Sequence, residues 1–152
     1  MKRIEPGHEG DGRRVAIVQA RFNPRIGQGL LAGALRALKD AHVGDDRIAI
    51  VTVPGALEAP LALQRLAQSG HYDALVALGA VIRGETYHFE IVANESAAGI
   101  AGVQLEFGIP IGNGVLTCDS DSQAEARMDA KGYEAAMAAL ELANLLDAID
   151  AK

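Results

Sequence analysis

The chain has 152 residues, enough for one domain with a sizeable hydrophobic core, and 49% of them are apolar, which argues against a disordered chain. The formal net charge is −6 and no long basic run is present, which weighs against general nucleic-acid binding, because such proteins present a positive surface. Cys118 is the single cysteine, so no intrachain disulfide can form, and we expect a cytoplasmic protein. Because no motif flanks Cys118, it is interpreted as apolar filler rather than a nucleophile.

The first twelve residues predict a flexible N-terminal arm ahead of one domain at residues 13–152. The stretch MKRIEPGHEGDGRR lacks the apolar core of a signal peptide, and no stretch approaches the roughly 20 apolar residues of a membrane span. Its glycines, proline and mixed charge favour a disordered tail. The alternative is an arm that pairs with the sheet edge of a neighbouring subunit.

The first predicted strand is RRVAIVQA, from Arg13, and a helix follows it. Apolar residues at i, i+3, i+4 and i+7 indicate this helix, and Gly44 is its stop signal; the apolar residues are Leu31, Ala34, Leu35 and Leu38. The second predicted strand is RIAIVTV, from Arg47. Both strands are nearly continuous apolar runs, which is typical of strands buried on both faces of a sheet.

The middle of the chain continues the alternation. A second helix is expected to begin near Leu57, because Pro60 is tolerated only in a first turn, and to end at Gly70. The third strand is ALVALGAV, from Ala74, which is again a continuous apolar run. The fourth strand is GNGVLTC, from Gly112.

The last part of the chain predicts two further helices. Ser120 and Gln123 form an S-x-x-Q capping box ahead of a short helix. The last helix is expected from about Lys131, with an inner stripe formed by Leu142, Leu145, Leu146 and Ile149.

This alternation predicts an α/β fold in which a four-stranded parallel sheet lies between two helical layers, a three-layer αβα sandwich. Right-handed crossovers restrict the topology to a flavodoxin-like or Rossmann-like arrangement, and we favour the flavodoxin-like one. Such sheets bind ligands beyond the carboxyl ends of their strands, so functional residues are expected there.

The residues after the third strand indicate an anion site. Gly84 lets the backbone approach a ligand, and a helix that begins near Thr86 would offer free N–H groups to a phosphate. Thr86 could donate its hydroxyl to that phosphate or simply cap the helix, whereas Glu85 counts against an anion unless its carboxylate points away. Arg83 is the obvious phosphate ligand by charge. His88, in the first turn, can move protons near neutral pH, although a lone histidine is more often a surface or packing residue.

Further candidates lie elsewhere in the chain. Phe22 follows the first strand and could stack on a flat ring or cap the core. Glu58 could accept hydrogen bonds from a ligand or complement the dipole of the second helix. Arg127 could bind a phosphate through two parallel hydrogen bonds, but by itself it is interpreted as a solvated arginine. The sequence has no GxGxxG, Walker A or metal-ligand spacing, which weighs against a dehydrogenase with a dinucleotide cofactor, a P-loop enzyme and a zinc enzyme.

Five motifs in order resemble one family. ARFN follows the first strand, VPGALEAP the second and GAVIRGETYHFEIVANESAAGI the third, and GVLTCDSDSQAEAR and KGYEAA come later. Together they resemble 6,7-dimethyl-8-ribityllumazine synthase from about Arg13 to the C-terminus. The resemblance implies a transferase of riboflavin biosynthesis that needs no cofactor or metal. It condenses 5-amino-6-(D-ribitylamino)uracil with 3,4-dihydroxy-2-butanone 4-phosphate to give the lumazine, phosphate and water.

The resemblance also implies a role for each matched residue. His88 would be the catalytic proton-transfer residue. The pyrimidine and its ribityl chain would lie against Phe22, Asn23, Ala56, Leu57, Glu58, Ala80, Val81, Ile82 and Asn113. The phosphate would be bound by Gly84, Glu85, Thr86 and Arg127. Lys131 is a further candidate, and Arg83 falls outside the phosphate set.

The assembly implied by the resemblance is a homopentamer with sites between adjacent subunits, so that position 113 and Arg127 come from the neighbour. Some members form decamers or icosahedral shells, and riboflavin synthase is a further partner to consider. The sequence departs from the family at Asn113, where phenylalanine is frequent. It also departs at Pro24, beside Phe22, and in a segment before Lys131 that is about four residues shorter.

Two other functions stay open at this point. One is a catalytically weak lumazine- or riboflavin-binding or shell-forming homologue, but a pure binder does not need a proton carrier such as His88. The other is a flavodoxin-like signalling protein, which would need acidic residues clustered at the strand ends. The sequence lacks such a cluster.

Overall fold

The computed structural model describes residues 1–151. Four strands alternate with four long helices, and two short 3-10 helices, η1 (Asp45–Arg47) and η2 (Ala56–Glu58), flank the second strand. The strands and long helices are β1 (Val15–Ala20), α1 (Pro24–Asp40), β2 (Ile48–Val53), α2 (Ala59–Ser69), β3 (Ala74–Ile82), α3 (His88–Phe107), β4 (Ile111–Cys118) and α4 (Asp121–Asp150).

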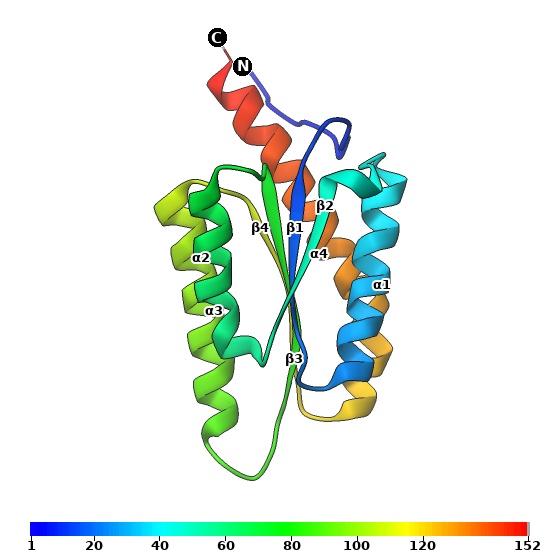
Figure 1. Ribbon diagram of the computed structural model, residues 1–152, viewed down its shortest axis with the longest axis vertical. Helices are drawn as coiled ribbons and strands as arrows, with labels where there is room; N and C mark the ends of the chain where they lie inside the picture. The colour runs from blue at the N-terminus through cyan, green and yellow to red at the C-terminus, as the bar shows by residue number, and fades with distance from the viewer. Residues whose placement is uncertain (152) are drawn as a thin grey trace.

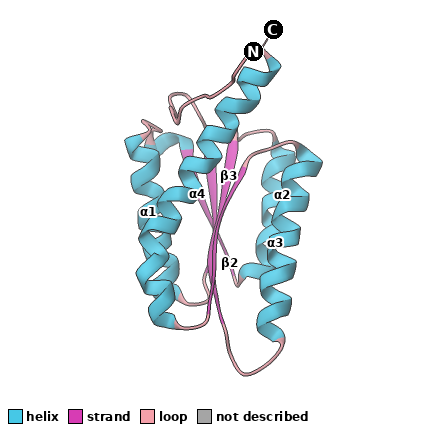
Figure 2. Ribbon diagram, turned by 180° about the vertical axis from the view of Figure 1, so that it is seen from behind, coloured by secondary structure: helices cyan, strands magenta, loops and turns pink. Residues whose placement is uncertain are grey.

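The sheet is entirely parallel and has the strand order β2-β1-β3-β4. Helices α1 and α4 cover one face and α2 and α3 cover the other, as Figures 1 and 2 show from opposite sides. The predicted three-layer, flavodoxin-like α/β fold is therefore confirmed. The chain leaves β1 toward one edge of the sheet and β3 toward the other, so the loops after these two neighbouring strands diverge at a topological switch point.

The burial of the strands follows their place in this order. The central strands β1 and β3 are almost completely buried, as their continuous apolar sequences predict. Strand β2 is an edge strand, and the Ile50 side chain is 47% exposed. The prediction that this run is buried on both faces was therefore wrong, because the sequence of β2 does not reveal that it has only one neighbour.

The first two helices lie close to where the sequence places them. Helix α1 has Pro24 in its first turn and ends at Asp40, four residues before the predicted stop at Gly44. Helix α2 has a proline in its first turn and ends at Gly70, whose backbone is left-handed, with φ of 70°. The first-turn proline and the terminal glycine of α2 are the features that Pro60 and Gly70 predict.

Helix α4 is a single helix of 30 residues, so the prediction of two helices divided near Lys131 was wrong. Its start was predicted correctly, because the Ser120 hydroxyl accepts a hydrogen bond from the Gln123 backbone N–H at 3.3 Å. Gly132 is not a break in this helix. A Cβ added there would lie 2.0 Å from the Leu30 carbonyl oxygen, so this glycine allows α4 and α1 to approach closely.

The buried face of α4 also differs from the predicted stripe of large residues. Ile149, at the end of that stripe, is 54% exposed, and the three leucines are only partly buried. Small residues and one leucine form the buried face instead, and they are Ala124, Gly132, Ala135, Ala136, Ala139, Leu140 and Ala143. Close packing against α1 and the sheet leaves room for little more than a methyl group, which the helical periodicity alone does not reveal.

Candidate functional site

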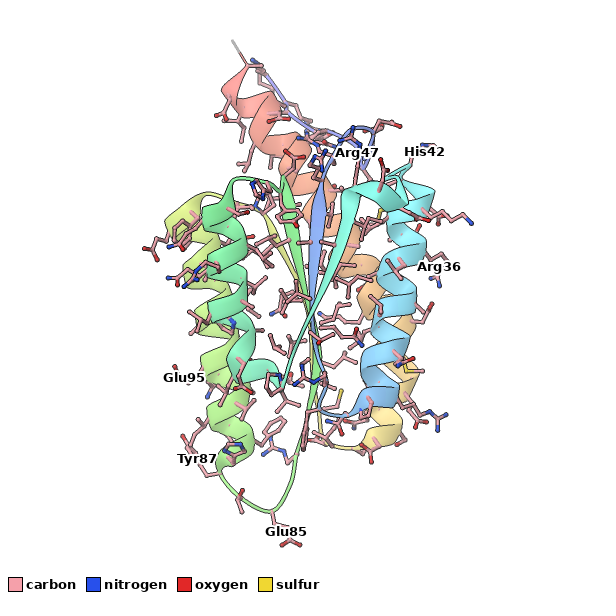
Figure 3. The ribbon with its side chains drawn as sticks, in the orientation of Figure 1. Arg36, His42, Arg47, Glu85, Tyr87 and Glu95 are labelled. Atoms are coloured by element: carbon pink, nitrogen blue, oxygen red, sulfur yellow. The ribbon has the colours of Figure 1, made fainter. Side chains whose placement is uncertain are left out.

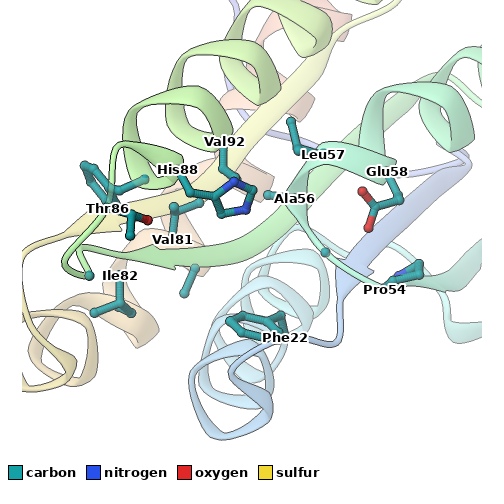
Figure 4. Close-up of a pocket in the computed structure, with 14 residues that line it drawn as sticks. Phe22, Pro54, Ala56, Leu57, Glu58, Val81, Ile82, Thr86, His88 and Val92 are labelled. Carbon is teal, nitrogen blue, oxygen red and sulfur yellow. The ribbon is translucent and has the colours of Figure 1, made fainter.

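A cavity of about 370 Å³ lies at the carboxyl ends of the strands, at the switch point between β1 and β3. It brings together the loop after β1, the residues after β2 and the loop from β3 into α3 (Figure 4). The lining residues are Phe22, Pro54, Gly55, Ala56, Leu57, Glu58, Ala80, Val81, Ile82, Gly84, Thr86, His88, Phe89 and Val92. A mostly apolar hollow with a few polar groups is typical of a small-molecule site.

The loop after β1 holds an aromatic ring at the cavity. The Phe22 backbone N–H donates to the Pro54 carbonyl at 3.0 Å, which fixes this loop to the end of β2. Asn23, the N-cap residue of α1, has a left-handed backbone with φ of 60° and donates its side-chain amide to the Ala80 carbonyl at 3.2 Å. The Phe22 side chain is nevertheless 72% exposed, so the ring is available for stacking and does not close the core.

The segment after β2 supplies a carboxylate and backbone groups. Ala56, Leu57 and Glu58 form η2, and Ala56 is buried while the other two are exposed. Within residues 1–151 the Glu58 carboxylate forms no ion pair. It is therefore free to accept hydrogen bonds from a ligand, although its place at the N-cap of α2 also lets it complement the helix dipole.

The end of β3 and the loop after it form the third wall. Ala80 and Val81 are buried in the sheet, whereas every residue from Arg83 to His88 is exposed. His88 is the first residue of α3, as expected, and Figure 4 shows His88, Glu58 and Phe22 on different sides of the cavity. The N-cap position belongs to Tyr87, and Thr86 forms no side-chain cap.

The loop is open enough to admit an anion. A Cβ added at Gly84 would have no atom within 4 Å, so its backbone is accessible. Thr86 has no hydrogen bond from its hydroxyl within the described residues, which leaves that hydroxyl for a ligand. Glu85 lies at the tip of the loop and points away from the rest of the protein in Figure 3, which removes the objection that its charge repels an anion.

Arg83 is occupied by other groups. Its guanidinium donates to Asp119 at 2.8 Å and to Glu90 at 2.5 Å, and it lies 4.3 Å from the centre of the Phe89 ring. The hydrogen bonds to Asp119 and then Glu90 raise the pKa of Arg83, and the bond from Arg83 is the main cause that lowers the pKa of Glu90. The arginine that charge alone would select for the phosphate is thus held in an internal ion-pair network.

Several predicted site residues lie away from this cavity in the single chain. Glu85 and Asn23 are adjacent to it but do not line it. Asn113 is on the edge strand β4, where its side-chain oxygen accepts from the Val115 backbone N–H at 2.9 Å. Arg127 and Lys131 are on α4, which covers the opposite face of the sheet from α3, and Arg127 donates to the Gln123 carbonyl at 3.0 Å.

Four lining residues were not among the predicted site residues. Pro54 and Gly55 directly follow the second predicted strand. Because ligands bind beyond the carboxyl ends of parallel strands, their position indicates them as site residues. Val92 lies four residues after His88 and three after Phe89, so it shares a face of α3 with each of them, and this spacing would have indicated it.

In the part of the chain that the structure describes, no group of three or more histidine, cysteine, aspartate or glutamate side chains could hold a metal ion. Across the same residues, no helix is both long enough and apolar enough to cross a membrane.

Comparison with known proteins bears on the identity of this cavity. The model of one protein family, described as 6,7-dimethyl-8-ribityllumazine synthase, matches residues 12–147. The chain belongs to this family. Curated lumazine synthases from Burkholderia multivorans and Paraburkholderia phytofirmans are each 56% identical to it over 146 residues. The alignments cover 96% of this chain and 85% and 87% of those two proteins.

The family resemblance inferred from the motifs is therefore confirmed. A third curated lumazine synthase, from Paraburkholderia phymatum, is 55% identical over 96% of this chain. The matched residues 12–147 include every residue that lines the cavity.

Proposed function

We propose that this protein condenses 5-amino-6-(D-ribitylamino)uracil with 3,4-dihydroxy-2-butanone 4-phosphate to give 6,7-dimethyl-8-ribityllumazine, phosphate and water. The observation that carries the proposal is one cavity that joins an exposed aromatic ring, a free carboxylate and a histidine from three separate segments, Phe22, Glu58 and His88. Family membership supports the same reaction.

The cavity has a suitable wall for each part of the substrates. The pyrimidine would stack on Phe22 and meet the backbone of residues 80–82, and Glu58 would accept hydrogen bonds from the ribityl hydroxyls. The phosphate would lie at the exposed loop of residues 84–86, before the first turn of α3, where backbone N–H groups and the helix dipole favour an anion.

The chemistry then consists mostly of positioning and proton transfer. The amine of the pyrimidine attacks the ketone and loses water to form a Schiff base, and phosphate is then eliminated. The resulting enol tautomerises to a carbonyl, and the second amine condenses with this carbonyl, losing a second water to close the ring. His88 is close enough to the phosphate loop to move protons during these steps. Holding the two substrates side by side accounts for a large part of the acceleration, because it replaces a bimolecular encounter.

We also propose that the protein is a cytoplasmic homopentamer in which Asn113 and Arg127 of one subunit complete the site of the next, with Lys131 as a further site residue. The support is that these residues lie outside the cavity of their own chain, while the cavity is open and the ring of Phe22 is exposed. Five chains of 15.9 kDa would have a native mass of about 80 kDa. A decamer or shell would be heavier, and a monomer would contradict the proposal.

A turnover assay tests the reaction itself. Purified protein supplied with both substrates is expected to form the fluorescent lumazine and to release phosphate. A binding or shell-forming homologue would instead bind lumazine or riboflavin in calorimetry with negligible turnover. Asn113 gives that second function its support, because a polar residue at this position removes one apolar wall that the family resemblance implies. Binding of riboflavin synthase would be tested by co-purification.

A further inference from the structure

The loop that carries the proposed phosphate site has few attachments to the rest of the fold. Residues 83–88 are all exposed, and Gly84 meets no atom within 4 Å of an added Cβ. In residues 1–151, one side-chain hydrogen bond joins residues 83–90 to another part of the chain, from Arg83 to Asp119, and a second, from Arg83 to Glu90, lies within the segment. Phe89 packs against the core, and Arg83 is the side chain that hydrogen-bonds this segment to the loop after β4.

Arg83 ties together three parts of the structure. Its backbone N–H donates to the Cys118 carbonyl at 2.8 Å, which extends the pairing of β3 with β4. Its guanidinium bonds Asp119, before α4, and Glu90, in the first turn of α3. The same guanidinium lies over the ring of Phe89, which lines the cavity. The first turn of α3, which begins at His88, is thus fixed to the sheet through this arginine.

Global stability does not account for these contacts. The side chains of Arg83, Glu90 and Asp119 are 47%, 33% and 68% exposed, and exposed ion pairs contribute little to folding. A contact that is weak for stability can still decide the position of a mobile catalytic group, because an error of about 1 Å can cost about 100-fold in rate.

We propose that Arg83 is a positioning residue that holds the first turn of α3, and with it His88, in its place at the cavity. The expected effect of Arg83 on turnover rests on the proposed function. Its effect on the position of the first turn of α3 does not. Arg83 itself does not line the cavity, so it acts through Phe89, Glu90 and His88 and not by binding the phosphate.

The chain contains a matched control for this arginine. Arg36, on the outer side of α1 (Figure 3), also donates two hydrogen bonds to a carboxylate, at 2.6 and 2.9 Å to Asp129, and lies 4.9 Å from the centre of the Tyr133 ring. Its side chain is 50% exposed, close to the value for Arg83. It differs in being remote from the cavity lining.

The first test measures amide hydrogen exchange in the unliganded protein. Replacement Arg83→Ala is expected to speed exchange at the Glu90 and Ile91 amides, which donate to the Tyr87 carbonyl, whereas Arg36→Ala is expected to leave them unchanged. Equal exchange in the wild type and Arg83→Ala would overturn the proposal. This readout needs no turnover, so it decides the role of Arg83 even if the proposed reaction fails.

The second test measures kinetics with both substrates. Arg83→Ala is expected to lower kcat by about 10- to 100-fold, with KM values changed less than about threefold. Arg83→Lys keeps the charge but loses the planar guanidinium that bonds two carboxylates, so an intermediate kcat is expected. In a His88→Ala background the same change should have less than about a threefold effect, because the residue that it positions is absent. An equal loss in both backgrounds, or an equal loss from Arg36→Ala, would overturn the proposal. Failure of the wild type to turn over would contradict only the proposed function.

Discussion

Two side chains in the first turn of α3 have different surroundings although they are two residues apart. His88 lines the cavity, whereas Glu90 accepts a hydrogen bond from Arg83 on the side of the β4–α4 connection. The sequence placed His88 in the first turn of a helix, but it could not show which carboxylates Arg83 would bind. The carboxylates of Glu90 and Asp119 converge on it only because β3 and β4 are adjacent in the sheet.

Replacement His88→Ala is expected to lower kcat by about 100-fold, because a positioned proton-transfer group contributes about that much. The fold should be retained, since the side chain is exposed at the start of a helix. Steady-state kinetics and a urea unfolding midpoint check the two parts. A kcat within threefold of the wild type would show that protons move by another group.

The ion pair of Arg83 with Glu90 is expected to be lost in acid. Because the folded state lowers the pKa of Glu90, its contribution to stability is fully present above the ordinary glutamate pKa and is lost as the pH falls through the lower folded-state value. The difference in unfolding midpoint between the wild type and Glu90→Gln should therefore shrink below about pH 4. A difference that grows in acid would contradict this assignment.

At the scale of the element, α4 shows how a glycine can be misread. The last helix was predicted to begin at about Lys131, next to Gly132, yet Gly132 is buried inside α4 where this helix packs against α1. Gly33 on the opposite helix has the same role, since an added Cβ would lie 2.2 Å from the Asp129 carbonyl oxygen. Glycines on both sides of a helix crossing permit backbone contact, so they stabilise packing here despite their low helix propensity.

Replacement Gly132→Ala is expected to lower the free energy of unfolding by about 3 kcal/mol, because the added methyl group would force α4 away from Leu30. Gly102→Ala in α3 is the matched control. An added Cβ there meets no atom within 4 Å, so the change is expected to raise stability by about 0.5–1 kcal/mol through helix propensity. Urea unfolding at one protein concentration measures both, and similar effects would refute the packing role of Gly132.

At the scale of the whole molecule, no lysine or arginine among residues 1–151 lines the cavity of one chain to bind the phosphate. Arg83 is engaged elsewhere, and Arg127 lies across the sheet on α4. Exposed apolar side chains on α2 and α3 suit a surface that a neighbouring subunit covers, and they include Leu61, Ile91 and Leu105. In a closed ring of subunits, a neighbouring subunit would bring its Arg127 to the cavity and would bury these apolar side chains.

Mixing two variants of low activity tests this sharing of sites. If Arg127 acts on the site of the next subunit, an equal mixture of His88→Ala and Arg127→Ala chains, refolded together, is expected to contain intact sites in about a quarter of positions. Activity should recover to about that fraction of the wild-type value. No recovery, with mixed assemblies shown by mass, would place both residues in the site of one chain.

The sequence by itself determined the alternation of strands and helices, the family and the residues at the strand ends, because these depend on local apolar periodicity, prolines, glycines and short motifs. Only the tertiary structure decided that β2 is an edge strand, that Gly132 lies inside one long helix and that Arg83 pairs with Glu90 and Asp119. Each of these depends on which elements become neighbours in space. Neighbours in space are set by strand order and helix packing, which no local pattern encodes.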